Sequence, residues 1–219
     1  MVDTDYNKIN QETYDSISSH WDTKRQNQWP KIVEFFDSLT ITPDTKMIDI
    51  GCGTGRVLEL AKQKGVTNPI GSDFSSGQLE IVKQKGFDTV ESDMRTIPKN
   101  DGAFDIIVNI AALHHLLATN EQLEAIKQMK RLLSKNGEML VSIWMPQNDF
   151  LDKQLEKGKF KFIKDKTVKV TYTSPDGVYE RFYYLFEQDE IVNMFEQCGL
   201  NCKKVELFNG NLYITANHK

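Results

Sequence analysis

The stretch that decides the fold is Lys46-Met-Ile-Asp-Ile-Gly-Cys-Gly-Thr-Gly55. Its first half, residues 46–50, is short and apolar and predicts a buried strand. Its second half, residues 51–55, predicts a tight turn that opens a helix, because glycine adopts backbone conformations that other residues avoid. A dinucleotide-binding turn would require a third glycine at the position of Arg56. The stretch therefore predicts a strand, a turn and a helix, but not a pyrophosphate site.

Beyond this stretch, short apolar runs alternate with helical patterns, which is typical of a parallel sheet with crossover helices. We expect further strands at 69–72, 89–92, 104–110 and 138–144, and helices at 55–65, 75–85 and 121–133. Later in the chain we expect a strand at 179–185, a helix at 187–198, and a hairpin of strands 202–207 and 212–216 around Asn209-Gly210. The predicted fold class is α/β: a single Rossmann-like domain over 1–219, with a seven-stranded, mostly parallel sheet ending in an antiparallel hairpin.

Two segments fall outside this alternation. Helical patterns at 6–18 and 29–39, the second with Pro30 in its first turn, predict an N-terminal helical cap over 1–42. Residues 147–178 break the pattern and predict a partly irregular insertion after the fifth strand. Within it, residues 151–170 hold seven Lys and three acidic residues, 7 − 3 = +4, whereas the whole chain carries −4. This stretch is either a solvated surface or a contact for a polyanion, while the overall acidity argues against general nucleic-acid binding.

Composition excludes several other classes. Cys52, Cys198 and Cys202 lack metal-ligand spacing, so we expect no metal site and reduced thiols. The N-terminal stretch MVDTDYNKIN is polar, unlike a secretion signal. No stretch approaches the roughly 18 apolar residues that cross a bilayer. We therefore expect a cytoplasmic protein without a membrane partner.

Three carboxylates lie at or just past the carboxyl ends of the first three predicted strands. Asp49 lies beside the glycine turn, Asp73 ends the second strand, and Asp93-Met94 follows the third. An acid by the turn suits a cationic ligand such as S-adenosylmethionine (SAM), whose sulfonium is positive. Asp73, about 20 residues past the turn, is placed to accept from ribose hydroxyls, and Asp93-Met94 would border an adenine.

This order of motifs resembles the class I SAM-dependent methyltransferase family along most of the chain. The resemblance implies SAM as methyl donor. The cofactor-binding residues that we expect are Asp49, Gly51, Cys52, Gly53, Gly55, Asp73, Phe74, Asp93, Met94 and Asn109. Thr54 in the glycine turn is common to many methyltransferases and does not indicate an acceptor.

His114-His115, just past the fourth strand, is the one candidate for a catalytic base. Because adjacent side chains point in different directions, we expect at most one of them, His115, to face the site. The alternative is that one histidine packs and the other caps a turn.

A narrower resemblance rests on residues 14–25 (YDSISSHWDTKR) with Trp29-Pro30, on residues 110–115 (IAALHH), on Trp144 and on residues 181–186 (RFYYLF). These are similar to the tRNA wobble-uridine carboxymethyl methyltransferases, which esterify the carboxylate of 5-carboxymethyluridine. The resemblance implies tRNA as partner, together with a small zinc-binding activator protein that adds a strand at the edge formed by residues 89–92. The family's basic segment before Trp-Pro is reduced here to Arg25-Gln-Asn-Gln, and its Val-Pro-Trp segment after strand five is not evident.

An acceptor carboxylate with a pKa near 4 is already ionised at pH 7, so it needs positioning rather than a base. We expect Arg25 and Arg181 to clamp it, and Tyr183, with Tyr14 and Trp29, to stack on the base. Trp29 and Tyr14 could instead pack the cap onto the sheet, and Arg181 could pair with a surface acid. The alternative functions are a small-molecule methyltransferase, acting on a quinone precursor or a carboxylic acid, and a SAM-binding scaffold without turnover.

Overall fold

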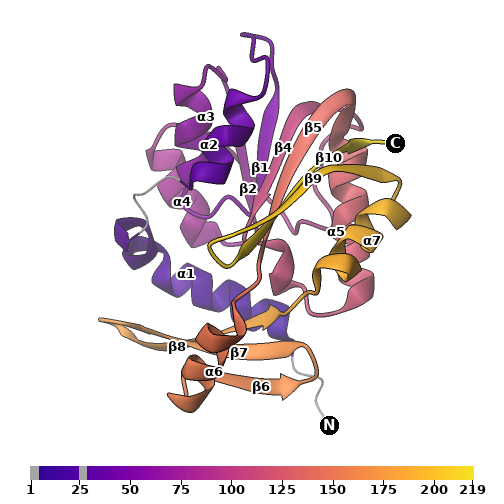
Figure 1. Ribbon diagram of the computed structural model, residues 1–219. Coiled ribbons are helices and arrows are strands. Elements are labelled where there is room, and N and C mark those ends of the chain that lie inside the picture. Colours follow the sequence, from indigo (N-terminus) through magenta and orange to yellow (C-terminus); the bar gives the residue numbers. More distant parts are fainter. Residues whose placement is uncertain (1–4, 25–28) are drawn as a thin grey trace.

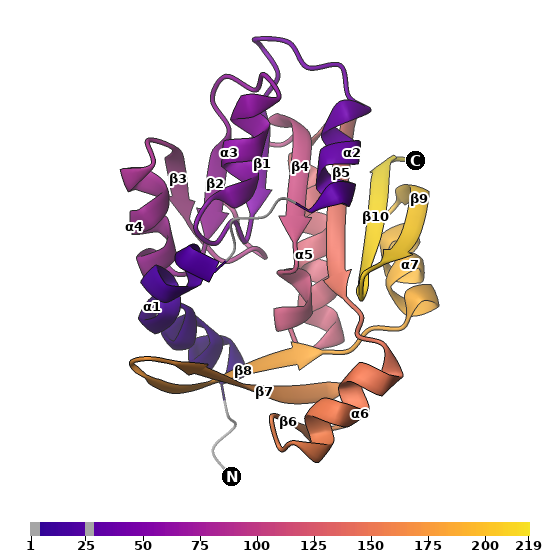
Figure 2. The ribbon, with the colours of Figure 1, turned by 60° about the vertical axis from the view of Figure 1, so that its left-hand side comes forward.

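The computed structural model describes residues 5–24 and 29–219, without the side chains of 19–24. The larger of its two sheets has seven strands, and Figures 1 and 2 show helices on both of its faces. Those strands are β1 (Met47–Ile50), β2 (Ile70–Asp73), β3 (Asp88–Glu91), β4 (Phe104–Ile110), β5 (Leu133–Trp144), β9 (Leu200–Phe208) and β10 (Asn211–His218). Their order is β3-β2-β1-β4-β5-β10-β9, with β1 to β5 parallel and β10 antiparallel to both neighbours. The predicted fold class is confirmed.

The central strand β4 explains why both faces need cover. Side chains alternate along a strand, so Ile106 and Val108 point to one face and Ile107 to the other. The first face is buried under α2 (Pro30–Asp37) and α3 (Arg56–Gln63), and the second under α5 (Thr119–Leu132) and α7 (Gln188–Gln197). Helix α4 (Ser76–Gln84) packs beside α3, through Leu79 and Val82. Pro30 lies in the first turn of α2, as predicted.

The turn between β9 and β10 has positive φ at both central residues, 47° at Asn209 and 71° at Gly210. That pair of angles defines the type I′ turn, whose twist matches that of the paired strands. The hairpin that Asn209-Gly210 predicted is therefore present.

The segment after β5 is more ordered than its sequence indicated. It forms α6 (Asn148–Glu156) and a second, antiparallel sheet of β6 (Phe160–Lys164), β7 (Thr167–Ser174) and β8 (Gly177–Tyr184). The strand expected at 179–185 belongs to this second sheet, where Tyr183 pairs with Val168. The turn Ser174-Pro-Asp-Gly177 was the available signal, because proline, aspartate and glycine in this order favour a two-residue reversal.

Helix α1 (Tyr6–Lys24) joins the two sheets. The Asn10 amide donates to the Phe182 carbonyl (3.2 Å) and accepts from the Phe182 N–H (2.9 Å). Both backbone groups of Phe182, at the open edge of β8, are thereby hydrogen-bonded. On its other side, Asp15 accepts from the Ser75 hydroxyl (2.6 Å) and the Gly77 N–H (3.0 Å) at the start of α4. Figure 2 shows α1 spanning the gap between α4 and β8. The helix thereby closes one side of the region at the carboxyl ends of β1, β2 and β4.

Candidate active site

The glycine turn depends on backbone conformations that favour glycine. Gly51, Gly53 and Gly55 have φ of 71°, 54° and 84°. The N–H groups of Gly51 and Cys52 donate to the Ser72 carbonyl (2.7 and 3.0 Å), so the turn is tied to the end of β2. Gly55 then starts α3. The turn is thus a fixed wall against which a ligand can lie.

Gly51→Ala should destabilise the fold by roughly 2–4 kcal/mol, since it combines left-handed strain with overpacking. A Cβ at Gly51 would overlap the Cβ of Ala112. Gly86 is a matched control, because its φ is 83° and nothing lies within 4 Å of an added Cβ. Urea unfolding should show a loss of only about 1–2 kcal/mol for Gly86→Ala. Equal losses for the two variants would mean that the contact with Ala112 is unimportant.

A cavity of about 1140 Å³, its open mouth included, lies against this turn. We call it the loop cavity. The residues that line it include eight of the expected cofactor-binding positions: Asp49, Gly51, Cys52, Gly53, Asp73, Phe74, Asp93 and Met94. Gly55 and Asn109 are not among the lining residues. Asn109 is fully buried, donating to the Ile50 carbonyl (2.9 Å) and accepting from the Leu113 N–H (3.2 Å), so it braces β4 against β1.

Asp49 is the most unusual carboxylate of the cavity. Its side chain is only 1% exposed, and neither of its oxygens has a hydrogen-bond partner among the described residues. Burial and the negative charge of Asp73 raise the pKa of Asp49 to about 8, although Arg56 opposes the shift. Arg56 lies on the same cavity wall, stacked 4.7 Å from the Trp29 ring centroid. A buried acid left without donors suits a cationic group that arrives with a ligand.

Asp73 holds the glycine turn. Its Oδ2 accepts from the Gly53 N–H (2.9 Å) and its Oδ1 from the Ser75 N–H (3.0 Å). Burial raises the pKa of Asp73 despite these backbone hydrogen bonds. Each carboxylate oxygen can accept more than one hydrogen bond, so the carboxylate retains acceptor capacity toward ligand hydroxyls.

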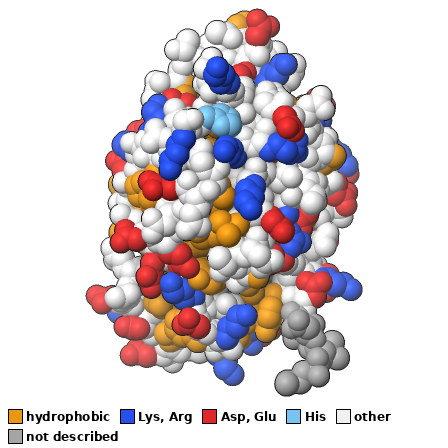
Figure 3. All heavy atoms as spheres, turned by 90° about the vertical axis from the view of Figure 1, so that its right-hand side faces the viewer, with side chains coloured by type: hydrophobic (Ala, Val, Ile, Leu, Met, Phe, Trp, Pro, Cys, Tyr) orange, Lys and Arg blue, Asp and Glu red, His pale blue; other side chains and the backbone are white. Residues whose placement is uncertain are grey.

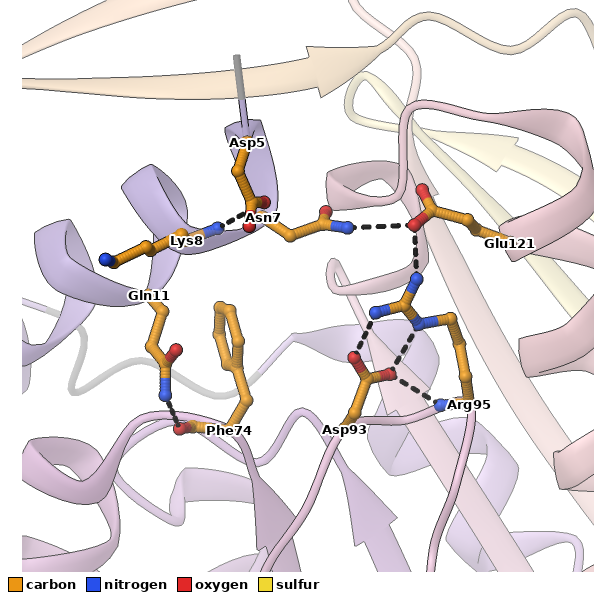
Figure 4. A network of polar contacts seen from close by, with 8 residues as sticks. All are labelled: Asp5, Asn7, Lys8, Gln11, Phe74, Asp93, Arg95 and Glu121. Carbon is orange, nitrogen blue, oxygen red and sulfur yellow. Dashed lines mark hydrogen bonds and ion pairs between the residues drawn. The ribbon is translucent and has the colours of Figure 1, made fainter. Parts of the chain in front are cut away.

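A polar network (Figure 4) borders the loop cavity through Asn7 and Asp93. Arg95 donates to both oxygens of Asp93, with Nε–Oδ1 at 2.9 Å and Nη2–Oδ2 at 2.5 Å, and also contacts Glu121. Burial opposes ionisation of Asp93, but the hydrogen bonds and charge of Arg95 outweigh it and lower the pKa of Asp93. Asn7 on α1 donates to the same Glu121 (3.0 Å). The network fixes Asp93 in its ionised form at the cavity wall.

Helix α1 supplies two lining residues that the sequence analysis missed, Asn7 and Asn10, beside Tyr14, which was expected at the acceptor site. The three residues follow the i, i+3, i+7 spacing of one helix face. Gln11 donates to the Phe74 carbonyl (2.7 Å), as Figure 4 shows. That polar spacing was the available signal, because an amphipathic helix usually buries an apolar face instead.

A second cavity of about 1010 Å³ adjoins the first. We call it the aromatic cavity, after the rings of Tyr14, Trp29, Trp144, Phe150, Phe160 and Tyr183 in its lining. Tyr14, Trp29, Ala111 and His115 line both cavities. Ala111 has a φ of 54°, which is uncommon for a residue other than glycine and marks this shared wall as a candidate functional position. The two cavities therefore meet at one wall.

Both histidines border the aromatic cavity, although only one was expected to face the site. His115 Nδ1 lies 3.2 Å from the Phe182 carbonyl, which can only accept, so we assign the proton of the neutral ring to Nδ1. His115 Nε2 then accepts from the Tyr14 hydroxyl (3.0 Å). His114 Nδ1 accepts from the Trp144 N–H (3.2 Å). His115 thereby holds Tyr14 at the shared wall, which is a positioning role.

Arg181 brings a positive charge to the aromatic cavity. It is 8% exposed, and its guanidinium lies 5.0 Å from the ring centroid of Tyr172 and 5.5 Å from that of Tyr183. Burial lowers the pKa of Arg181, but Tyr183, Tyr14 and Tyr172 outweigh burial and raise it above the ordinary value. The Tyr183 ring lies 4.7 Å from His115 and 5.3 Å from Trp144. Of the expected acceptor-binding residues, the structure brings together His115, Arg181 and Tyr183, while Arg25 lies outside the described residues.

The sequence of residues 21–205 matches the family described as methyltransferase domain. The chain belongs to this family. A relative of the methyltransferase, the Xenopus tropicalis tRNA (carboxymethyluridine(34)-5-O)-methyltransferase alkbh8, is 32% identical over 153 residues. This match covers 69% of the chain but only 23% of the Xenopus protein. The tRNA (carboxymethyluridine(34)-5-O)-methyltransferase of Schizosaccharomyces pombe is 27% identical over 212 residues, covering 88% of the chain and 89% of that protein.

Among solved structures, the methyltransferase resembles a chain in the complex of the Haloferax volcanii Trm112 methyltransferase activator with a methyltransferase. The TM-score is 0.73 at 12% identity, over 95% of this chain and 97% of that one, which shows the shared fold. Within residues 5–24 and 29–219, no helix is both long and apolar enough to cross a bilayer. Over the same residues, no group of three or more His, Cys, Asp or Glu side chains is arranged to hold a metal ion.

Proposed function

We propose that this methyltransferase transfers the methyl group of SAM to the carboxylate of 5-carboxymethyluridine at the wobble position of tRNA. The observation that carries the proposal is the buried guanidinium of Arg181 in an aromatic cavity that meets the loop cavity. An aromatic pocket suits a flipped-out base, and a guanidinium suits its carboxylate. The names of the Xenopus and Schizosaccharomyces relatives support the same acceptor.

The residues of the loop cavity fit SAM, which supplies an electrophilic methyl group when bound. Asp49 offers an unpartnered carboxylate to the positive end, and Arg56 on the same wall offers a cation to the amino-acid carboxylate. Asp73 keeps acceptor capacity for ribose hydroxyls, and Phe74, Asp93 and Met94 border the space for the adenine. Cys52 and the glycines shape the wall by their backbone. Gly55 acts through the turn, and Asn109 through its brace between β1 and β4.

On the acceptor side, the protein's task is to position a carboxylate that is already ionised at neutral pH. Arg181 binds and orients the carboxylate, and we assign Arg25 as a second cation on the basis of the sequence. Tyr183 and Trp144 stack on the uracil, while His115 holds Tyr14 at the shared wall. No side chain has to remove a proton from the acceptor, which agrees with the use of both His115 nitrogens in holding Tyr14 and Phe182.

We further propose that a small zinc-binding activator binds at the free edge of β3, by adding a strand beside Thr89 and Val90. The activator complex among the similar folds supports this partner. In the proposed division of the chain, one domain over 1–219 carries the cofactor site, and the cap at 1–42 and the insertion at 147–178 complete the acceptor site. A cytoplasmic location with reduced thiols belongs to the same proposal.

The function is tested with labelled SAM and tRNA from cells that lack the modification, with and without the activator. Nucleoside analysis should show the methyl ester of 5-carboxymethyluridine. No ester under either condition would refute the tRNA acceptor. Transfer to small carboxylic acids or quinone precursors instead would establish the alternative, a small-molecule methyltransferase. Binding of SAM without transfer to any acceptor would identify a scaffold.

A further inference from the structure

Helix α6 carries three different stripes of side chains. Successive residues of a helix are turned by about 100°, so residues three, four and seven positions apart share a face. Leu151 and Leu155 form an apolar stripe. The other two stripes are a basic and aromatic one, Phe150, Lys153 and Gln154, continued by Lys157 at the C-cap, and an acidic one, Asp149, Asp152 and Glu156. The centres of these two stripes are about 120° apart around the helix axis.

The basic stripe faces the mouth of the aromatic cavity. Phe150 and Gln154 line that cavity, and so does Lys159 in the turn between α6 and β6. Since Lys153 and Lys157 share the helix face of Phe150, they extend the rim of the cavity outward. The acidic stripe is centred on another side of the helix, with Asp149 and Glu156 as the i−4 and i+3 neighbours of Lys153. We call Lys153, Lys157 and Lys159 the lysine rim; all three are exposed.

Aromatic rings continue along the same rim. Phe160 on β6 lies 5.7 Å from Trp144 and 6.0 Å from Phe150, measured between ring centroids. Phe162 shares the strand face of Phe160 by alternation and is 45% exposed, while Phe150 is 47% exposed. Large exposed rings beside free cations are unusual on a purely solvated surface.

The lysines of the rim differ from other lysines of the same segment. Lys166 pairs with Glu187 (3.2 Å) and Glu190 (3.0 Å), and Lys169 pairs with Glu180 (2.5 Å). Within the described part of the chain, no carboxylate lies within ion-pair distance of the lysine rim. Elsewhere, on the face that carries α7 and β9, cations and acids are interspersed (Figure 3), as in the pair of Lys204 and Glu206. The lysine rim is thus a cationic patch at a cavity mouth.

We propose that the lysine rim, with Phe150 and Phe162, binds the sugar–phosphate backbone and neighbouring bases of the RNA strand whose target nucleotide enters the aromatic cavity. This inference rests on the proposed function. One phosphate per nucleotide matches a row of lysines, and bases on either side of the target can stack on the two exposed rings. The rim binds the strand outside the reacting centre, so it contributes affinity for RNA and not chemistry.

The test uses the full chain, with the activator where activity requires it, and an anticodon stem-loop that carries 5-carboxymethyluridine. Lys153, Lys157 and Lys159 are replaced together by alanine. The control replaces Lys83, Lys127 and Lys135, which are exposed on α4, α5 and β5 and have no ion pair with a described residue. Both variants lose three charges, so overall charge alone affects them equally.

At low salt the rim variant should bind the stem-loop at least about tenfold more weakly than the control variant. The slope of log affinity against log salt should become shallower by roughly 2, at about 0.7 for each lost phosphate contact. SAM binding should stay at the wild-type level in both variants, and in the rim variant methylation of the free nucleoside should fall less than methylation of the stem-loop. That combination assigns the rim to the RNA strand.

If the wild-type protein methylates the stem-loop but the two variants bind it equally, with equal salt slopes, the lysine rim does not bind the RNA strand. The proposed function would then remain intact. Absence of RNA methylation by the wild-type protein would refute both. An equal loss of activity on the free nucleoside and on the stem-loop would also refute RNA binding by the lysine rim, because it would show damage to the aromatic cavity itself.

Discussion

Replacing Arg181 by methionine should lower kcat/KM for the carboxymethyl acceptor about 100-fold or more, because a buried charge pair that loses one partner costs about 2–5 kcal/mol. Arg181 is 8% exposed in the aromatic cavity, so water cannot readily replace the guanidinium there. Arg181→Lys keeps the charge but loses bidentate binding of the carboxylate, and we expect about a tenfold loss in kcat/KM. The measurement is steady-state kinetics with the stem-loop as variable substrate.

The loss should appear in KM for the acceptor as well as in kcat, while KM for SAM stays unchanged. Binding of the methyl ester, the neutral product, should be nearly insensitive to the replacement. If the ester and the carboxylate lose affinity equally, Arg181 supports the packing of Tyr172 and Tyr183 and does not bind the carboxylate. Thermal unfolding and SAM binding of each variant separate these effects from misfolding.

Asp49→Asn should weaken SAM binding about 10- to 100-fold at pH 8 and abolish most of its dependence on pH. The pKa of Asp49 is about 8 because the side chain is buried next to Asp73, with Arg56 opposing the shift. A cationic ligand requires the ionised carboxylate, so below pH 8 binding must release a proton. We expect wild-type affinity to increase up to about tenfold for each pH unit from 6 to 8, and to level off above 8.

Calorimetry in buffers of different ionisation enthalpy checks this by counting the protons released, close to one below pH 7 for the wild type and none for Asp49→Asn. Repeating it with S-adenosylhomocysteine identifies the paired group. The pH dependence disappears if Asp49 pairs with the sulfonium and persists if it pairs with the amino group. A wild-type affinity that is independent of pH would show that Asp49 does not bind a cation.

The same carboxylate links pH to the stability of the ligand-free protein. The folded state keeps the Asp49 proton up to about pH 8, whereas the unfolded chain releases it near the ordinary value of 3.8. Between these values the unfolded state binds fewer protons, so this group makes the free energy of unfolding fall as pH rises. The fall is at most about 1.4 kcal/mol per pH unit. Asp49→Asn should remove it.

The main sheet could be predicted because its signals are local. The strand at 104–110 is a mostly apolar run with the same limits in the structure, and Asn209-Gly210 specifies its turn by backbone preference alone. The second sheet could not be predicted as easily. In Phe160–Lys164, two lysines interrupt the apolar residues, so the strand has no clear alternation. Phe160 is covered by Trp144 and Phe150, which lie outside the strand that β6 pairs with.

The loop cavity could be predicted in part for the same reason. Asp49 and Asp73 lie at the carboxyl ends of β1 and β2, and Asp93 follows β3, so their approach is dictated by sheet order. The lining by α1 depends on contacts such as that of Asn10 with Phe182, which are 172 residues apart and leave no local pattern. In the sequence, Arg56 served only to exclude a dinucleotide-binding turn, which needs glycine at that position. In the structure, its stacking on Trp29 places a cation in the loop cavity.

The wall shared by the two cavities has a consequence for how such a protein can diversify. The loop cavity is built mainly from β1 to β4 and the turns that follow them, whereas the aromatic cavity adds α6 and the second sheet, encoded as one continuous block after β5. Among the residues that the structure describes, only Tyr14, Trp29, Ala111 and His115 belong to both. An exchange of that block between relatives would present a new acceptor to the same methyl donor. The exchange requires that these four side chains be kept, and that α1 still bind the edge of the strand that replaces β8.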